Sequence, residues 1–196
     1  MFAELLGQRL GSVIVLSSKQ INQLERHYEL LLRWNKVLNL TSVVKLEEIV
    51  ERHYCESLFL AAHLPAEKLH IADVGAGAGF PGIPIAVARP DCSISMIESH
   101  RRKCVFLREA TREMDNIRVI EGRAEDVGEQ FDWAVSRAVR SSKIEKLLRS
   151  LADSVGLLAG EEGPSNTCFT WNTPIQLPWG KRRYLWMGGT VSRETR

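Results

Sequence analysis

The chain has 196 residues, of which 44% are hydrophobic, and its 26 Lys and Arg against 24 Asp and Glu give a net charge of +2. This length suits one domain with a small extension, and the apolar fraction excludes an intrinsically disordered chain. No apolar run approaches the roughly 20 residues that cross a bilayer, which excludes an integral membrane protein. Residues 1–10 lack the basic head and long apolar core of a secretory signal, so we expect a cytoplasmic protein.

The cysteines and histidines indicate neither a disulfide scaffold nor a metal site. The four cysteines are widely and irregularly spaced without a CxxC pair, and the five histidines lack the spacing of metal ligands. We therefore expect reduced thiols and no bound metal.

The charge is distributed unevenly along the chain. Residues 1–98 hold 9 basic and 11 acidic side chains, whereas residues 99–196 hold 17 basic and 13 acidic ones. The excess lies in clusters, including Arg101, Arg102 and Lys103, and later Arg137 and Arg140. Such clusters either contact phosphate groups or form solvated faces.

The first 65 residues have the pattern of a helical cap. Ser17 and Ser18 are candidate N-caps, and apolar side chains then recur at helical spacing to residue 32. A second helical stretch runs from about residue 46 to residue 64, where Pro65 stops it. The sequence therefore predicts a helical N-terminal cap at 1–65.

From residue 69 onward, short apolar strands alternate with helical segments. The expected strands are 69–74, 93–98, 116–120, 131–135 and 155–159, with further strands at 168–171 and 184–187. The expected helices are 81–89, about 100–114, and a segment around 144–151. This alternation predicts an α/β fold in which a Rossmann-like parallel sheet carries helices on both faces. We assign residues 66–196 to this core and expect the cap and the core to form one compact unit.

The strongest local signal is the run DVGAGAGFPG at residues 73–82, which an expected strand enters and an expected helix leaves. Gly75, Gly77 and Gly79 let the backbone turn sharply and let a ligand approach closely. Glu98 ends the next strand, 21 residues after Gly77. A carboxylate at that place can accept hydrogen bonds from both ribose hydroxyls, so the loop and the acid together predict a cofactor that contains adenosine.

Two such cofactors compete for this loop. The frame G-x-G-x-x-G at 77–82 matches the dinucleotide fingerprint by letter. However, Pro81 and Pro84 remove backbone N–H donors that a pyrophosphate would use. Asp73, expected at the mouth of the loop, would repel a pyrophosphate but suit the cationic methionine part of S-adenosylmethionine. The pattern therefore favours S-adenosylmethionine over NAD, and a glycine turn without a ligand is the remaining interpretation.

Five blocks of sequence together resemble one family. They are the glycine loop, RWNKVLNLT at 33–41, ERHYCESL at 51–58, RKCVFL at 102–107 and SRA at 136–138. This set, which covers about residues 20–140, is similar to RsmG, formerly GidB, a family of bacterial 16S ribosomal RNA guanine-N7 methyltransferases. The resemblance implies a class I methyltransferase fold that uses S-adenosylmethionine.

The resemblance also implies roles for individual residues. Gly75 and Phe80 should line the cofactor, Ala124 and Glu125 should flank its adenine, and Arg137 should lie where the cofactor meets the target base. Together with the loop, the expected cofactor-binding residues are Asp73, Gly75, Gly77, Gly79, Phe80, Glu98, Ala124, Glu125 and Arg137, and Arg137 is also the expected catalytic residue. The expected nucleic-acid contacts are Asn39, Arg52, His53, Arg101, Arg102, Lys103 and Arg140. The expected partner is 16S ribosomal RNA or the small ribosomal subunit, bound by a monomer.

The sequence departs from the family after Leu151. The family usually carries Lys-Gly near the end of its fifth strand, whereas the run LLAGEE at 157–162 has no lysine. The helix expected after that strand is also truncated or missing. Two alternatives to the methyltransferase therefore stay open: an RNA-binding or ribosome-associated relative with weakened or lost turnover, and an NAD-dependent oxidoreductase.

Overall fold

A capping box starts the longest helix of the N-terminal part. In the computed structural model, the Ser17 hydroxyl accepts from the Gln20 N–H while the Gln20 side chain accepts from the Ser17 N–H. Helix α2 then runs over Ser18–Leu38 and ends at Asn39, whose left-handed backbone closes the last turn. A short helix that the sequence did not predict, α1 (Phe2–Leu10), packs against the cap with Phe2, Leu6 and Leu10 buried.

The segment expected as one helix from 46 to 64 is helical throughout but changes its winding. It consists of α3 (Leu46–Ile49), the π-helical η1 (Val50–Cys55) and α4 (Glu56–His63). Leu64 then adopts an extended backbone, as a residue before a proline prefers. π-helical turns are found frequently at functional sites, so η1 is a segment to compare with the predicted site residues.

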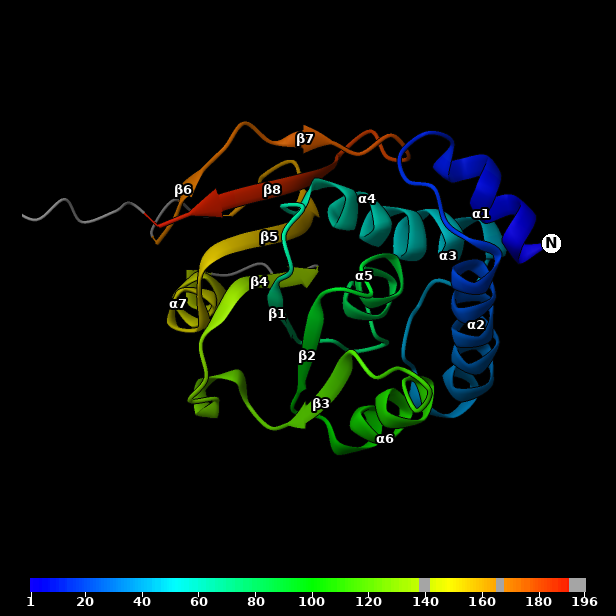
Figure 1. Ribbon diagram of the computed structural model, residues 1–196, viewed down its shortest axis with the longest axis horizontal. Helices are drawn as coiled ribbons and strands as arrows, with labels where there is room; N and C mark the ends of the chain where they lie inside the picture. The colour runs from blue at the N-terminus through cyan, green and yellow to red at the C-terminus, as the bar shows by residue number, and fades with distance from the viewer. Residues whose placement is uncertain (138–141, 165–167, 191–196) are drawn as a thin grey trace, which may run out of the picture.

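The structure describes residues 1–137, 142–164 and 168–190, and Arg140 lies outside these ranges. Within them, no helix has both the length and the apolar character that a bilayer crossing requires. The strands are β1 (His70–Val74), β2 (Ser93–Glu98), β3 (Ile117–Glu121), β4 (Phe131–Arg137), β5 (Ala152–Gly160), β6 (Thr170–Trp171), β7 (Ile175–Gln176) and β8 (Arg183–Gly189). They form one sheet in the order β3-β2-β1-β4-β5-β8-β6, with β7 also paired to β8 (Figure 1).

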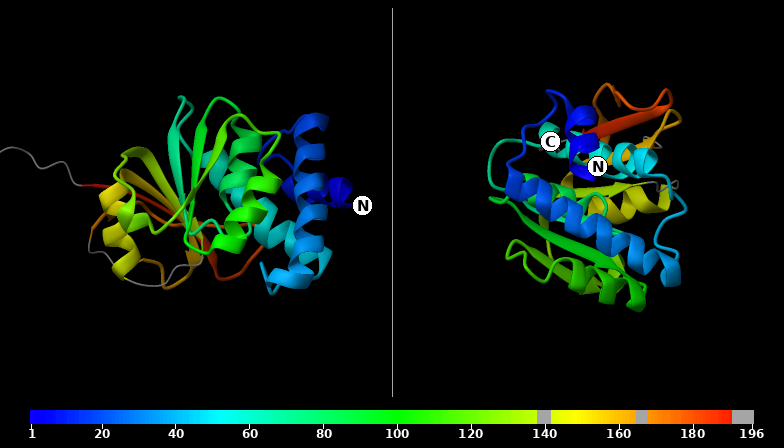
Figure 2. Two further views of the ribbon diagram at one scale, coloured as in Figure 1. Left: turned by 90° about the horizontal axis from the view of Figure 1, so that it is seen from below. Right: turned by 90° about the vertical axis from the view of Figure 1, so that its right-hand side faces the viewer.

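The five strands from β1 to β5 are parallel, whereas β8 runs antiparallel to β5. The sheet places α5 (Gly82–Ala88) and α6 (Arg101–Ala110) on one face, with α2 beyond them, and α7 (Ser142–Leu151) on the other (Figure 2). Helices therefore lie on both faces, which confirms the expected α/β architecture. Cap helices and the sheet share one hydrophobic cluster, and a second cluster lies beneath α7.

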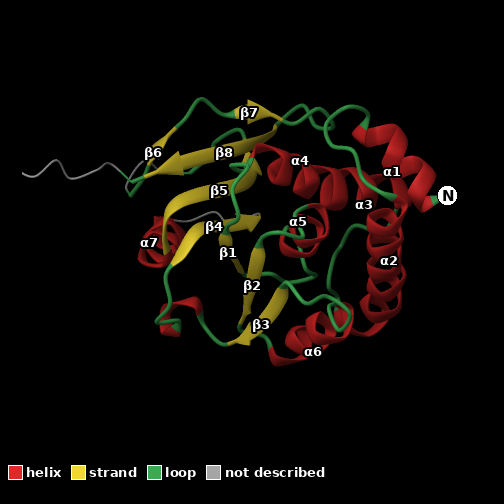
Figure 3. Cartoon of the chain, viewed as in Figure 1, coloured by secondary structure: helices red, strands yellow, loops and turns green. Residues whose placement is uncertain are grey.

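The C-terminal part differs most from the expectation (Figure 3). The strand at 184–187 is found as β8, but the one at 168–171 is reduced to the two residues of β6, and β7 was not predicted. Among the described residues between β5 and β8, none is helical. Strands of two residues are hard to predict because they are too short to show an alternation of apolar and polar side chains. They form here by pairing with β8.

Candidate functional site

The glycine loop leaves the carboxyl end of β1 and leads into α5. The N–H groups of Gly75 and Ala76 both donate to the carbonyl of Ile97 on β2, at 2.9 and 3.2 Å. Gly75 has φ 73°, a left-handed conformation that favours glycine, and an added Cβ there would meet no atom within 4 Å. The loop is thus tied to the neighbouring strand and presents an open glycine at the edge where α/β sheets bind ligands.

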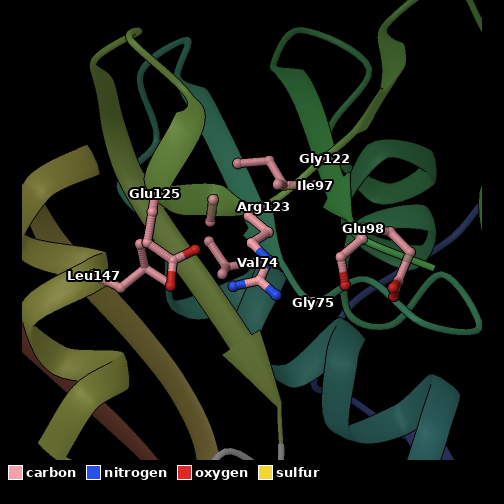
Figure 4. Close-up of a pocket in the computed structure, with 10 residues that line it drawn as sticks. Val74, Gly75, Ile97, Glu98, Gly122, Arg123, Glu125 and Leu147 are labelled. Carbon is pink, nitrogen blue, oxygen red and sulfur yellow. The ribbon is translucent and has the colours of Figure 1, made fainter.

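A cavity of about 310 Å³ opens beside this glycine (Figure 4). Its lining comes from the ends of β1 and β2, from the residues that follow β3, including the short 3-10 helix η2 (Ala124–Asp126), and from α7. The lining residues are Val74, Gly75, Ile97, Glu98, Ser99, Gly122, Arg123, Ala124, Glu125 and Leu147. Glu98 lies on one side and Glu125 with Leu147 on the other, and Arg123 extends between them. The structure therefore brings together four of the predicted cofactor residues: Gly75, Glu98, Ala124 and Glu125.

Sequence reasoning missed several residues of this cavity. Gly122 and Arg123 follow β3 directly, so the rule that ligands bind at the carboxyl ends of strands could have found them. Leu147 gave no such signal, because a leucine on an amphipathic helix is indistinguishable from an ordinary core residue. It reaches the cavity only because α7 packs against β4 and β5.

Glu98 occupies the place that the spacing predicts. One carboxylate oxygen accepts from the Gly77 N–H at 3.0 Å, and the other accepts from the His100 N–H at 2.8 Å. These two bonds fix the carboxylate at the end of β2 while it remains part of the cavity wall. A carboxylate has about four acceptor positions, so it can also accept from the hydroxyls of a ligand. Gly77 thus acts through its N–H by holding Glu98.

Asp73 lies beneath the loop rather than at its mouth, because its side chain is fully buried at the end of β1. One carboxyl oxygen accepts from the Gly82 N–H at 2.8 Å, and the other has no hydrogen-bond partner. Burial raises the pKa of this carboxyl to about 7, against the opposing effects of the Gly82 N–H and the charge of Arg137. A buried acceptor without a partner is costly and suggests that a group outside the chain completes it.

Gly79 faces the protein interior. It has φ 87°, and an added Cβ would lie 2.4 Å from Ile83 Cδ1 and 3.3 Å from His27 Nε2. Close packing on this side therefore requires glycine, and a cofactor contact at Gly79 stays a prediction. Its role is to let α2 and α5 approach the loop.

His27 of α2 holds the glycine loop from the cap. Its Nε2 lies 3.0 Å from the Ala78 carbonyl oxygen, and its Nδ1 lies 2.9 Å from the Tyr54 hydroxyl. Because a carbonyl only accepts, Nε2 carries the proton and Nδ1 accepts from Tyr54. Burial lowers the pKa of His27 to about 4, so the ring is neutral at pH 7.

Arg137 ends β4 and points to the cap rather than into the cavity. Its Nη1 donates to the Arg52 carbonyl at 2.7 Å and lies 2.6 Å from His53 Nδ1. Its guanidinium carbon lies 5.6 Å from the centre of the Phe80 ring. Burial lowers the pKa of Arg137 to about 10, so the guanidinium remains charged at pH 7. Arg137, His53 and Phe80, all predicted site residues, therefore meet in one cluster beside the loop.

The predicted nucleic-acid contacts lie in different surroundings. Asn39 is exposed at the end of α2, and the basic run at 101–103 forms the first turn of α6. Arg52 is half exposed and lies 3.9 Å from Glu48. His53, by contrast, is 1% exposed and has no surface to offer to RNA in this conformation. The contact predicted for Arg140 lies outside the described residues.

The cavity fits an adenosine better than a dinucleotide. Its charged lining consists of Glu98, Glu125 and Arg123, so carboxylates outnumber cations where a pyrophosphate would need positive charge. Glu98 offers acceptors for ribose hydroxyls, and Ile97 with Leu147 offers apolar surface for a base. These donor and acceptor sets suit S-adenosylmethionine.

Comparisons with known proteins agree with this geometry. The family model GidB, rRNA small subunit methyltransferase G, matches residues 20–160. Relatives described as ribosomal RNA small subunit methyltransferase G include one from Leuconostoc citreum, 31% identical over 91% of this chain and 77% of its own length. One from Leuconostoc mesenteroides is 34% identical and the alignment covers 67% of this chain and 59% of the relative. One from Pelotomaculum thermopropionicum is 40% identical, with 64% of this chain and 56% of the relative covered. The chain thus spans less than two thirds of the latter two relatives.

Solved structures share the fold at low identity. A SAM-dependent methyltransferase from Aquifex aeolicus aligns with TM-score 0.58 and 12% identity, over 74% of this chain and 93% of its own. Fibrillarin, a pre-rRNA processing protein from Methanococcus jannaschii, aligns with TM-score 0.51 and 18% identity, over 63% of this chain and 66% of its own. At these identities the likeness concerns the fold alone.

Proposed function

The chain belongs to the rRNA small subunit methyltransferase G family, and from this premise we propose that it transfers a methyl group from S-adenosylmethionine to N7 of a guanine in 16S ribosomal RNA. The observation that carries the proposal is the cavity at the carboxyl ends of β1, β2 and β3, in which Gly75, Glu98, Ala124 and Glu125 meet. We further propose that the protein acts as a cytoplasmic monomer on the RNA or the small subunit.

The proposed chemistry asks little of the protein beyond positioning. S-adenosylmethionine supplies an electrophilic methyl group, and guanine N7 has a free lone pair and no proton to remove. A general base is therefore unnecessary, and the protein has to align the reacting atoms and exclude water. Glu98 would hold the ribose, and the open backbone at Gly75 would admit the cofactor.

Arg137 is the proposed link between the cofactor and the target base. Its planar fork can donate to a guanine edge, and two of its contacts already fix its orientation. Methylation makes the base cationic, so the guanidinium should hold O6 or a phosphate and leave N7 clear. A base in folded RNA must be splayed out to reach such a site, at the cost of unstacking. The basic run at 101–103 would contact the phosphates.

The first experiment is a calorimetric titration of the purified protein with S-adenosylmethionine and, separately, with NAD. We expect saturable one-to-one binding of S-adenosylmethionine alone, followed by methyl transfer to small subunits that lack the modification. Binding of NAD alone would replace the proposal by an oxidoreductase. Binding of S-adenosylmethionine without methyl transfer would favour an RNA-binding relative that has lost turnover, in line with the absence of helix among the described residues between β5 and β8.

Arg137→Ala tests the proposed role of the arginine. We expect methyl transfer to fall by about 10- to 100-fold, because one charge-assisted contact is lost. Its free energy of unfolding should change less than its activity. An equal loss of both would make Arg137 a structural residue.

A further inference from the structure

Arg137 could act as proposed only if its guanidinium is held in place, and a chain of hydrogen bonds through the buried His53 does this. The chain begins at Thr41, in the segment between α2 and α3, passes through His53 in η1 and ends at Arg137 on β4. His53 and Arg137 are 84 positions apart, so the contact exists only because the cap packs against the end of the sheet.

The direction of each hydrogen bond follows from the groups involved. A guanidinium has only donors, so His53 Nδ1 must accept from Arg137 Nη1. The ring is then neutral with its proton on Nε2, which donates to the Thr41 hydroxyl at 2.8 Å. Thr41 is held in turn, because its backbone N–H and carbonyl both bond the side chain of Asn35.

The surroundings of His53 keep the ring in this form. The residue is 1% exposed, and its ring centre lies 4.8 Å from that of Phe80. Burial, followed by the charge of Arg137, lowers the pKa of His53 to about 3. Arg52 and the more distant His27 add smaller effects of the same sign, and the backbone bond at Arg52 opposes them.

The π-helical winding of η1 provides the second contact. Arg137 Nη1 also donates to the Arg52 carbonyl, the residue immediately before His53. Two neighbouring acceptors, a backbone oxygen and a ring nitrogen, therefore hold one nitrogen of the guanidinium, while Phe80 lies against its carbon. Both of these hydrogen bonds use Nη1.

We propose that His53 is a positioning residue: as a neutral acceptor fixed by Thr41, it orients the Arg137 guanidinium against Phe80 for its role in the methyltransferase site. This inference rests on the proposed function for the role of Arg137, and it replaces the direct RNA contact expected for His53. Residues 52 and 53 of the cap, and not only the glycine loop, therefore help to form the site.

Two matched substitutions separate the two ring nitrogens. In His53→Asn the amide oxygen lies near the position of Nδ1 and can still accept from Arg137. In His53→Gln the amide reaches the position of Nε2, so it can bond Thr41 but leaves Arg137 without its acceptor. We expect His53→Gln to lower methyl transfer to small subunits by about 10-fold and His53→Asn by no more than about 3-fold, because Arg137 lies outside the cofactor cavity and is proposed to hold the target base.

Both substitutions are then repeated in the Arg137→Ala background. A positioning residue that acts through Arg137 loses its effect there, so His53→Gln should cause little further loss of methyl transfer. Melting temperatures of all variants are measured alongside. Equal effects of His53→Gln with and without Arg137, or equal losses for Asn and Gln, would overturn the inference and leave His53 as a core residue.

Nitrogen NMR of the imidazole rings provides a readout that needs no cofactor. We expect His53 to be neutral at pH 7 with its proton on Nε2. The chemical shift of its Nδ1 should change when Arg137 is replaced by Ala. A proton on Nδ1 in the wild-type protein would refute the proposed bond. If the wild-type protein fails to bind S-adenosylmethionine, the proposed function fails, while these spectra still decide whether His53 holds Arg137.

Discussion

The two sides of the glycine loop differ in how open they are. On one side, Glu98, Arg123 and Glu125 line an open cavity, and two backbone N–H groups fix Glu98. On the other side, Arg137, His53 and Phe80 are packed against the cap, and side chains hold one another. The open side is built to receive a ligand, whereas the closed side is assembled before any ligand arrives. The comparison suggests that substitutions on the closed side will mainly change the stability of the fold or the orientation of Arg137. Substitutions on the open side will mainly change the affinity for the cofactor.

The largest effect is expected on the closed side, where Arg183 of β8 clamps Glu56 of α4. Arg183 donates through Nε and Nη2 to the two oxygens of Glu56, at 3.1 and 2.5 Å. The Glu56 side chain is 3% exposed and that of Arg183 is 26% exposed. Arg183→Ala should lower the free energy of unfolding by about 2–4 kcal/mol, because it leaves a buried carboxylate without its partner.

The neighbouring arginine is the matched control for this clamp. Arg182 pairs with Glu161 at the surface, with 80% of its side chain exposed. Arg182→Ala should cost less than about 1 kcal/mol in urea unfolding. If both variants lose the same stability, the Arg183–Glu56 pair does not hold β8 to the cap.

The next largest effect is expected on the open side, at Glu98. Glu98→Gln places an amide N–H2 where one oxygen accepts a backbone N–H, and it weakens acceptance from ribose hydroxyls. We expect S-adenosylmethionine to bind about 10- to 100-fold more weakly in calorimetry, as for the loss of a charge-assisted hydrogen bond. Glu121→Gln is the control, because that carboxylate also ends a strand, β3, but pairs with Arg108 and does not line the cavity. A similar loss there would contradict the role given to Glu98.

The smallest effect is expected at Asp73, which lies between the two sides. Besides burial, which raises its pKa most, Glu98 from the open side raises the pKa and Arg137 from the closed side lowers it. Its pKa of about 7 is above that of an unfolded aspartate, about 3.9, so the folded protein binds the proton more tightly. Its contribution to stability is therefore fully present below about pH 4 and is lost as the pH rises to about 7. Asp73→Asn removes this loss.

Thermal unfolding at several pH values tests this. Asp73→Asn should be more stable than the wild-type protein at pH 8 by on the order of 1–2 kcal/mol, and the difference should shrink as the pH falls toward 5. The gain is limited because the amide leaves an N–H2 where one carboxyl oxygen has no partner. A difference that is constant between pH 5 and 8 would place the pKa of Asp73 near its ordinary value.

Features encoded by neighbouring residues were predictable from the sequence. Ser17, one of the two candidate N-caps, caps α2, and β2 has the predicted bounds at 93–98. The position of Glu98 beside the glycine loop was also visible, because a strand end 21 residues after Gly77 leaves the acid at the same edge of the sheet. Its hydrogen bond from the Gly77 N–H was not predicted. Periodicity, caps and the parallel order of strands act over short stretches, so local physics specifies them.

The tertiary structure alone decided how distant segments share the work. His53 could be read as an RNA contact until packing buried it against Phe80, and nothing near Arg183 in sequence indicates that it binds Glu56, 127 positions away. The burial of Asp73 likewise depends on α5 closing over β1. The sequence by itself therefore determined the α/β alternation, the glycine loop and its acid. The orientation of Arg137 and the charge states of the buried groups followed only from packing, because desolvation and long-range hydrogen bonds exist only once the chain is folded.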